Sequence, residues 1–479
     1  MVEKPSGDEN EGRCNHGNRI QEGGDRRHRG GRTRRHRGWR GPLRSARDAG
    51  HLVVALGGRE RRPRASRRKL IMTLPVMPSQ ADVLWDQERA GTPSNNLGFV
   101  LTFGPDISDA RVVRGLEAVI SVFAAFRIRC SGSAESGYSQ EILPPSEPAD
   151  IELLDVADFD LRRVDRYLQA VLYRDSVAWD WQRRGTYRFR VLKADQGVHH
   201  VAASLQHVAF DHRSVQIVLD SIRDFALTSD EKRRTTTDSD DYEKAVRATI
   251  PNADASERAR AYWENELSTV PAAFSVPFDS RPAPWHRQSL VLEGDDYTRF
   301  RERAGTSTWG AAALLLERLL DEWRERQPSA AVVDVRLNCR PPRFEKQVGM
   351  FATTRPLVFD LVGTEWRSRV WSKLMRAAVH QCVDSITLRA IEEGSGIGAH
   401  RPIPVFDYVV DTESSTSSAL HSPGTDVRRV PFRPRSVTYR PMGLSVRERG
   451  GSVAIQLGLN SRLFNQADVT TMLNRIAGR

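Results

Sequence analysis

The chain lacks the features that would place it in a membrane, a disulfide framework or a zinc fold. No run of about 18 apolar residues occurs and the mean hydropathy is −0.50, so we expect no transmembrane helix. The four cysteines, Cys14, Cys130, Cys339 and Cys382, form no CxxC pair and no Cys/His cluster. They predict neither a metal site nor a disulfide, and they favour a reduced, cytoplasmic compartment.

Several common catalytic patterns are also missing. The sequence has no GxSxG, no P-loop, no GxGxxG and no HExxH. It begins without the apolar core and small-residue cleavage site of a secretory signal. No sequence motif therefore indicates serine-elbow hydrolysis, P-loop nucleotide binding, Rossmann dinucleotide binding or zincin chemistry.

Positive charge is concentrated at the N-terminus. Residues 1–71 hold 20 Lys and Arg against 8 Asp and Glu, whereas the remaining residues hold 52 against 53. This Gly- and Arg-rich segment has too little apolar surface to fold, so we expect it to be disordered. It is either an RGG-like nucleic-acid arm or upstream sequence ahead of a true start at Met72, and we favour the second. Because positive and negative charges are nearly equal in residues 72–479, we predict no groove for nucleic acid in this part of the chain.

The remaining sequence alternates between helical and strand patterns. Its length suits two or three domains. Each half mixes amphipathic helices with hairpins of alternating strands, which predicts an α+β architecture duplicated in outline. We place the halves at 72–245 and 246–479. The clearest helices and hairpins are expected at 109–126, 160–175, 187–208, 215–225, 309–323, 331–338, 442–460 and 465–478.

One stretch combines a strand end with titratable side chains: SLQHVAFDHRSVQIVLDSI, Ser204 to Ile222. His207 stands four residues before Asp211, and an imidazole that titrates near neutrality can take a proton from an attacking amine or alcohol. Asp211 can hold the turn, or pair with an arginine across the fold. The alternative is that His207 is a structural strand-end residue. We expect Ser214, and Thr308 further along the chain, to be helix N-caps.

The motif resembles the HHxxxDG signature of nonribosomal-peptide condensation domains, which are relatives of the chloramphenicol acetyltransferases. The order of further stretches along residues 72–479 supports this resemblance. These stretches are LPVMPSQADVLW with Ser79, Gln80 and Trp85, LEAVISVFAAFRIRC with Arg127, ARAYWENEL, NCRPPRFEKQVGMFATTRPLVFDL, PVFDYVVD and LSVRERGGSVAIQLGLNSRLF.

The resemblance implies two chloramphenicol-acetyltransferase-like lobes in a V-shaped pseudo-dimer, with a tunnel at their junction. It makes His207 the residue that orients or deprotonates the nucleophile attacking a thioester. It makes Asp211 a structural residue paired with an arginine of the second lobe, for which Arg340 is the candidate. Gly349 and Phe351 are expected to line the tunnel.

Two positions depart from the signature. The first histidine is replaced by Gln206, which can still support the loop through hydrogen bonds. The glycine is replaced by His212, which adds bulk beside the tunnel. His212 can narrow the channel or act as a second titrating group, or the site can have lost catalysis.

The resemblance leaves three functions open. The first is a freestanding condensation enzyme that joins a thioester on an acyl or peptidyl carrier protein to a small amine or hydroxyl acceptor. The second is an acyltransferase that uses coenzyme A, and the third is an inactive docking domain. No cofactor is expected to be bound, since phosphopantetheine arrives with the substrate on the carrier or as coenzyme A. No membrane partner is expected, and we predict a monomer.

Overall fold

The computed structural model describes most of the chain after Met72. Residues 1–71 and the predicted turn residues Asp195 and Gln196 lie outside the described residues. The description covers 72–90, 96–145, 149–156, 161–177, 185–194, 197–227, 239–271, 283–397, 403–410, 425–428, 437–438 and 440–479.

The first half is built on a five-stranded sheet in the order β12-β2-β7-β6-β5. The predicted hairpin is confirmed: β6 and β7 pair antiparallel, and β7 also pairs antiparallel with β2. All side chains of β7 are buried, because helices cover both faces of the sheet. The strands are β2 (Leu97–Phe103), β5 (Ile151–Asp155), β6 (Tyr187–Lys193), β7 (His199–Leu205) and β12 (Thr425–Arg428).

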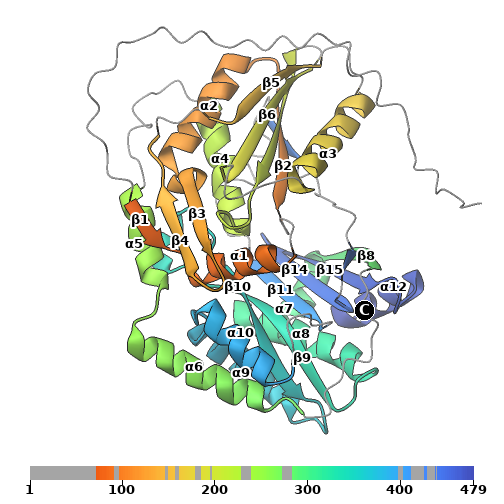
Figure 1. Ribbon diagram of the computed structural model, residues 1–479. Helices are drawn as coiled ribbons and strands as arrows, with labels where there is room; N and C mark the ends of the chain where they lie inside the picture. The colour runs from red at the N-terminus through yellow and green to blue at the C-terminus, as the bar shows by residue number, and fades with distance from the viewer. Residues whose placement is uncertain are drawn as a thin grey trace, which may run out of the picture. The chain divides into compact units, whose positions relative to one another are not determined.

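Period-two alternation divides the sheet between two cores. Phe99, Leu101 and Phe103 of β2 join the cluster formed with α2 (Asp109–Val122) and α4 (His212–Leu227). Val100, between them, joins the cluster formed with α3 (Leu161–Val177). Figure 1 shows α2 and α4 together on one side of this sheet and α3 on the other. The helix α4 begins where β7 ends, so the motif loop lies at the edge of the larger core.

A small antiparallel sheet accompanies the first half. It has the order β1-β4-β3, in which β4 pairs antiparallel with both β1 and β3. Helix α5 (Ser239–Thr249) packs here through the fully buried Tyr242, and the domain boundary predicted after residue 245 falls inside this helix. The other elements are β1 (Met72–Pro75), α1 (Pro78–Ala90), η2 (Ala124–Arg127), β3 (Ile128–Ser133) and β4 (Gly137–Ile142).

The second half is built on a seven-stranded sheet in the order β10-β9-β11-β14-β15-β8-β13. The β9–β10 and β14–β15 pairs are antiparallel hairpin neighbours, while β11 lies parallel to both β9 and β14. The strands are β8 (Ala283–Leu292), β9 (Ala330–Asn338), β10 (Ala352–Asp360), β11 (Val405–Val410), β13 (Val437–Thr438), β14 (Met442–Arg449) and β15 (Ser452–Asn460). Two α+β halves are therefore confirmed.

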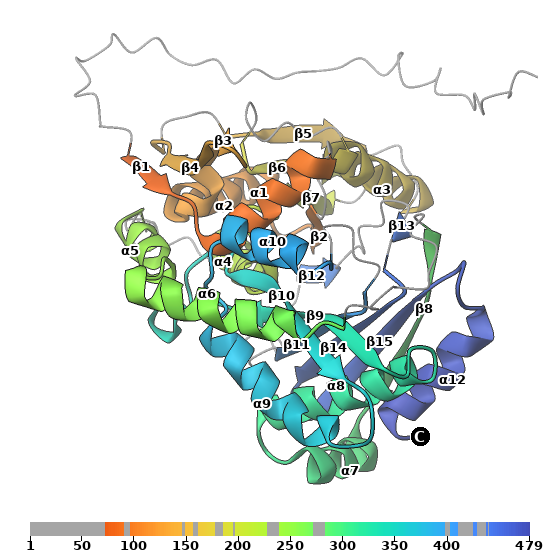
Figure 2. The same ribbon diagram turned by 60° about the horizontal axis from the view of Figure 1, so that its bottom comes forward.

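Helices cover one side of this sheet, as Figure 2 shows for α7, α8, α9 and α12. The sequence analysis predicted α8 and α12 and did not predict α7, α9 or α10. The helices are α6 (Ala253–Ser268), α7 (Gly294–Ala304), α8 (Thr308–Arg324), α9 (Trp366–Val379), α10 (Ser385–Gly394) and α12 (Gln466–Ala477), with the short η5 (Pro342–Phe344) between β9 and β10. None of the helices in the described ranges is long and apolar enough to cross a membrane.

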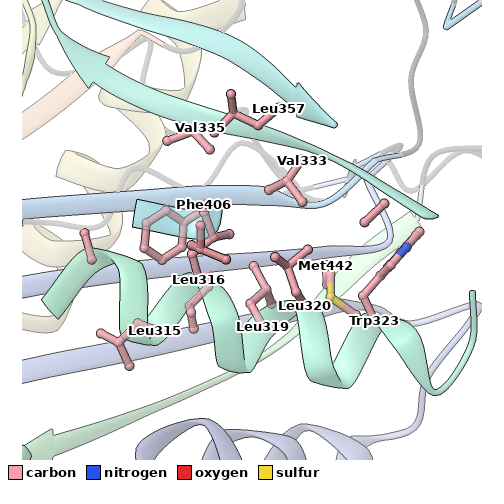
Figure 3. Close-up of a cluster of buried hydrophobic side chains, with 14 of the residues drawn as sticks. Leu315, Leu316, Leu319, Leu320, Trp323, Val333, Val335, Leu357, Phe406 and Met442 are labelled. Carbon is pink, nitrogen blue, oxygen red and sulfur yellow. The ribbon is translucent and has the colours of Figure 1, made fainter. Parts of the chain in front are cut away.

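The core of the second half lies under α8. Leu316, Leu319 and Trp323 point at strand residues such as Val335 and Phe406 (Figure 3). The N-cap of α8 is Ser307, whose side chain accepts from the backbone N–H of Gly310 at 3.2 Å, and not Thr308.

Truncation in this core should be costly. Leu316→Ala is expected to lower the free energy of unfolding by about 2–5 kcal/mol, because it leaves a cavity among fully buried neighbours. Val379→Ala is the control, since that side chain is 74% exposed and should change stability by less than about 0.5 kcal/mol. Urea unfolding of both variants measures the difference, and equal effects would contradict this assignment of the core.

One strand crosses between the halves. β12 belongs to the second half of the sequence, yet it pairs antiparallel with β2 at the edge of the five-stranded sheet. Backbone hydrogen bonds therefore tie the two sequence halves together, and a cut at a single residue does not separate two independent folding units.

Candidate functional site

The motif forms a tight turn between β7 and α4. Gln206 donates its backbone N–H to Thr186 O at 2.8 Å, and its own carbonyl accepts from Ala209 N at 3.0 Å. His207 lies at the start of this turn, where its Nδ1 is 2.9 Å from Phe210 O. A carbonyl only accepts, so Nδ1 carries the proton and Nε2 is left as the basic nitrogen.

The imidazole of His207 is partly exposed and stays neutral at neutral pH. Burial lowers the pKa of His207 below its usual range, and the positive charge of Arg336 on β9 lowers it further. The backbone of the motif turn, at His207 itself and at Phe210, makes hydrogen bonds to the ring that partly offset this lowering of the pKa. The motif histidine of the first half therefore lies within electrostatic range of Arg336 in the second half, and its Nε2 can accept a proton.

Asp211 is the N-cap of α4 and the centre of a buried network. One carboxylate oxygen accepts from Ser214 N at 2.7 Å. Arg340 donates to both carboxylate oxygens at 2.8 Å, and Phe351 N donates to Oδ2 at 3.0 Å. The side chains of Arg340 and Asp211 are 2% and 4% exposed. All four of these hydrogen bonds come from protein groups, and each carboxylate oxygen accepts two of them. The carboxylate of Asp211 therefore has a structural role and does not bind a substrate.

Ser214 has a different position from the one expected. The helix begins at His212, so Asp211 caps it and Ser214 lies within the first turn. Its hydroxyl donates to Gly349 O at 2.6 Å and accepts from Gly349 N at 2.9 Å. It also lies 3.1 Å from Arg340 Nη2. The side chain thus locks the loop of the second half onto α4.

Gly349 and Phe351 lie at the contact between the two halves. Both are buried, and Phe351 is part of the core of the first half. The guanidinium of Arg340 stacks over the Phe351 ring with 4.1 Å to the centroid. A Cβ on Gly349 would come within 2.6 Å of that ring, so the close approach requires glycine. These residues fasten the two halves together, and the tunnel-lining role that the resemblance implies for them stays a prediction.

The two departures from the signature have distinct surroundings. Gln206 is 1% exposed, and its side-chain Nε2 has no hydrogen-bond partner among the described residues. His212 is partly exposed and contacts Arg447 of β14, whose Nη1 bonds Nε2 and lies 3.3 Å from Nδ1. The side chain that replaces the glycine therefore reaches across to the second half.

A second connection was missed by the sequence analysis. Asp82 of α1 accepts from Arg355 of β10 at 2.7 Å and from Thr353 Oγ1 at 2.8 Å. Arg355 is fully buried. Ser79 Oγ also donates to Met350 O at 2.5 Å. Because these partners are more than 270 residues apart in sequence, no local spacing could reveal them.

A cavity of about 570 Å³ lies between α6 and α10, lined by residues such as Leu267 and Ile391. No residue of the motif lines it. In the described part of the chain, no group of three or more His, Cys, Asp or Glu residues is arranged to hold a metal ion.

The fold and the motif together define the family. The family model "Condensation domain" matches residues 72–478, and the chain therefore belongs to the condensation-domain family. Members of this family transfer acyl or peptidyl groups in nonribosomal peptide synthesis. No curated protein matches the chain.

Solved structures share the fold at low identity. A variant of the starter condensation domain of rhizomide synthetase, solved with C8-CoA, has a TM-score of 0.63 and 12% identity over 85% of this chain and 95% of that one. The X-domain from teicoplanin biosynthesis has a TM-score of 0.63 and 16% identity, over 84% and 93%. A four-domain nonribosomal peptide synthetase bound to AMP and glycine has 0.66 and 15%, over 85% of this chain and 32% of that one.

Proposed function

We propose that the protein is a freestanding condensation-type acyltransferase of specialised metabolism. It joins an acyl or aminoacyl thioester on a carrier protein to the amine or hydroxyl of a small acceptor. The observation that supports this most directly is the tautomer of His207: Phe210 O holds Nδ1, so Nε2 is the proton acceptor on a partly exposed, neutral ring.

The proposed reaction follows from that geometry. The acceptor nitrogen or oxygen attacks the thioester carbonyl carbon, a C–N or C–O bond forms, and the C–S bond breaks. The nucleophile's proton goes to His207 Nε2, and from there to the thiolate that leaves. Asp211 and Arg340 hold the turn that positions the ring. Gln206 and His212 leave this arrangement of His207 intact, which favours an active enzyme over an inactive docking domain.

The donor is tested with intact mass spectrometry. Candidate carrier proteins loaded with acyl groups are mixed with the enzyme and an amine or alcohol acceptor, and loss of the acyl mass from the carrier is followed. Acyl-coenzyme A donors form the second arm of the experiment, because the starter condensation domain of rhizomide synthetase was solved with C8-CoA. Turnover with acyl-coenzyme A alone would replace the carrier proposal, and binding of a carrier without transfer in either arm would favour a docking domain.

The pH dependence of the reaction rate should reflect the ionisation of His207. Arg336 disfavours the imidazolium, so Arg336→Gln raises the pKa of His207 and moves the acid limb of kcat/KM to higher pH. Asp407 lies 3.4 Å from Arg336, and its carboxylate, once released, acts in the same direction. Arg369→Gln is the control, because its side chain is 59% exposed and pairs with Glu365 on α9. An unmoved acid limb in Arg336→Gln would show that His207 is not the titrating base.

A further inference from the structure

The strand β14 presents one face to the core and the other to the motif. Met442, Leu444 and Val446 are fully buried in the core of the second half. By the period of two, Ser445 and Arg447 lie on the opposite face. The contact between Arg447 and His212 shows that this face looks toward the start of α4.

Arg336 of β9 lies on the same face of the same sheet. Val333, Val335 and Leu337 of β9 are in the core, whereas Arg336 between them is exposed and acts on the pKa of His207. His207 and His212 therefore both lie near this surface of β9 and β14, which are neighbours of β11.

Two other arginines at this surface have carboxylate partners. Arg336 lies 3.4 Å from Asp407 on β11, and Arg440 lies 2.7 Å from Asp334 on β9. The buried arginines that join the halves, Arg340 and Arg355, pair with aspartates at 2.8 Å and 2.7 Å. In each case a negative charge neutralises the guanidinium.

Arg447 differs from these arginines. Within the described ranges its side chain bonds only to the ring of His212, and no carboxylate lies within ion-pair distance. A guanidinium cannot accept, so the histidine nitrogen that it bonds is unprotonated and neutral. The charge of this partly buried arginine is therefore left without a counter-charge, next to the site of the proposed transfer.

We propose that Arg447 recognises a carboxylate on the substrate of the acyl transfer, with His212 as its partner when no substrate is bound. This inference rests on the proposed function for the identity of the reaction. A guanidinium donates two parallel N–H bonds to a carboxylate, and such a pair is stronger than a single bond to an imidazole. The substrate class is thus an acidic donor or an acidic acceptor.

The first test measures binding without turnover. Glutarate and its diamide, glutaramide, are titrated calorimetrically into the full chain and its variants. Wild type is expected to bind glutarate about 10- to 100-fold more tightly than glutaramide, as a charge-assisted hydrogen bond predicts. In Arg447→Met this preference should disappear, and Arg447→Lys should keep part of it because lysine retains the charge without the planar pair of donors.

Arg449→Met is the matched control. Arg449 lies two residues further along β14, on the same face and also partly exposed. Its loss removes the same charge, so glutarate affinity should stay within about twofold of wild type if recognition belongs to one guanidinium and not to the general potential. Equal losses in the two variants, or no preference for glutarate in wild type, would overturn the proposal.

The second test separates donor from acceptor. Glutamyl- and glutaminyl-loaded carrier proteins are compared as donors, and β-alanine and its amide as acceptors. The arm in which wild type prefers the acid, and Arg447→Met does not, identifies the acidic substrate. If no donor is turned over, the proposed function fails, while selective glutarate binding still supports the carboxylate site. If turnover occurs without preference for either acid, the carboxylate proposal fails and the proposed function stands.

Discussion

Replacing His207 by alanine is expected to lower the rate of acyl transfer by about a hundred- to ten-thousandfold. The substitution removes the nitrogen that accepts the proton of the nucleophile, and from the fold it removes the hydrogen bond from Nδ1 to Phe210 O. The loss of stability should therefore be about 1 kcal/mol. Single-turnover transfer from a loaded carrier measures the first effect, and thermal unfolding the second.

The control for this substitution lies on the same turn of the chain. Arg213 follows His212 and pairs with the exposed Glu345 at 3.3 Å. Arg213→Gln should retain transfer close to that of wild type, because an exposed ion pair contributes little to stability and Arg213 makes no contact with His207 in the described structure. Transfer at the wild-type rate by His207→Ala would remove this imidazole from the mechanism.

Breaking the Asp211–Arg340 pair should destabilise the fold more than any surface change. Asp211→Ala leaves the guanidinium of Arg340 buried without its counter-charge, and this costs about 3–5 kcal/mol. It also removes the cap of α4 and the acceptor of Phe351 N. Activity should fall together with stability, because the turn that holds His207 ends at Asp211.

A double-mutant cycle distinguishes a lost pair from two separate defects. Asp211→Ala combined with Arg340→Ala should cost less than the sum of the single changes, since neither charge is then left alone. Lys244→Ala provides the surface comparison: it breaks an ion pair whose side chains are both 65% exposed and should cost less than about 1 kcal/mol. Urea unfolding measures all four variants, and strictly additive losses would show that the pair is not coupled.

Much of the fold follows from local patterns. The amphipathic periods of α2 and α8 and the alternation in β14 and β15 indicate their structures, because burial of one face repeats every 3.6 or two residues. Helix α9 carries four basic residues and was not predicted, yet its buried residues Trp366, Val370, Leu374 and Ala377 recur at helical spacing. The same local pattern therefore indicates this helix too.

The sequence located the starts of α4 and α8 but not the side chains that cap them. Ser214 and Thr308 were both predicted as capping residues, yet the side chains that cap are Asp211 and Ser307. A hydroxyl near a helix start is a capping signal, but several candidates stand close together in both segments. The choice among them depends on which backbone N–H each side chain reaches, and tertiary packing decides it.

The sequence by itself determined the α+β elements, the strand-end position of His207 and its spacing from Asp211, because these depend on neighbours a few residues away. Only the tertiary structure decided that Arg340, 129 residues further on, holds Asp211, and that Gly349 and Phe351 bond Ser214 and Asp211. It also decided that Arg447 meets the histidine at position 212. The physical reason is that packing between distant segments selects these partners, and periodicity along one segment carries no information about the surface it will meet.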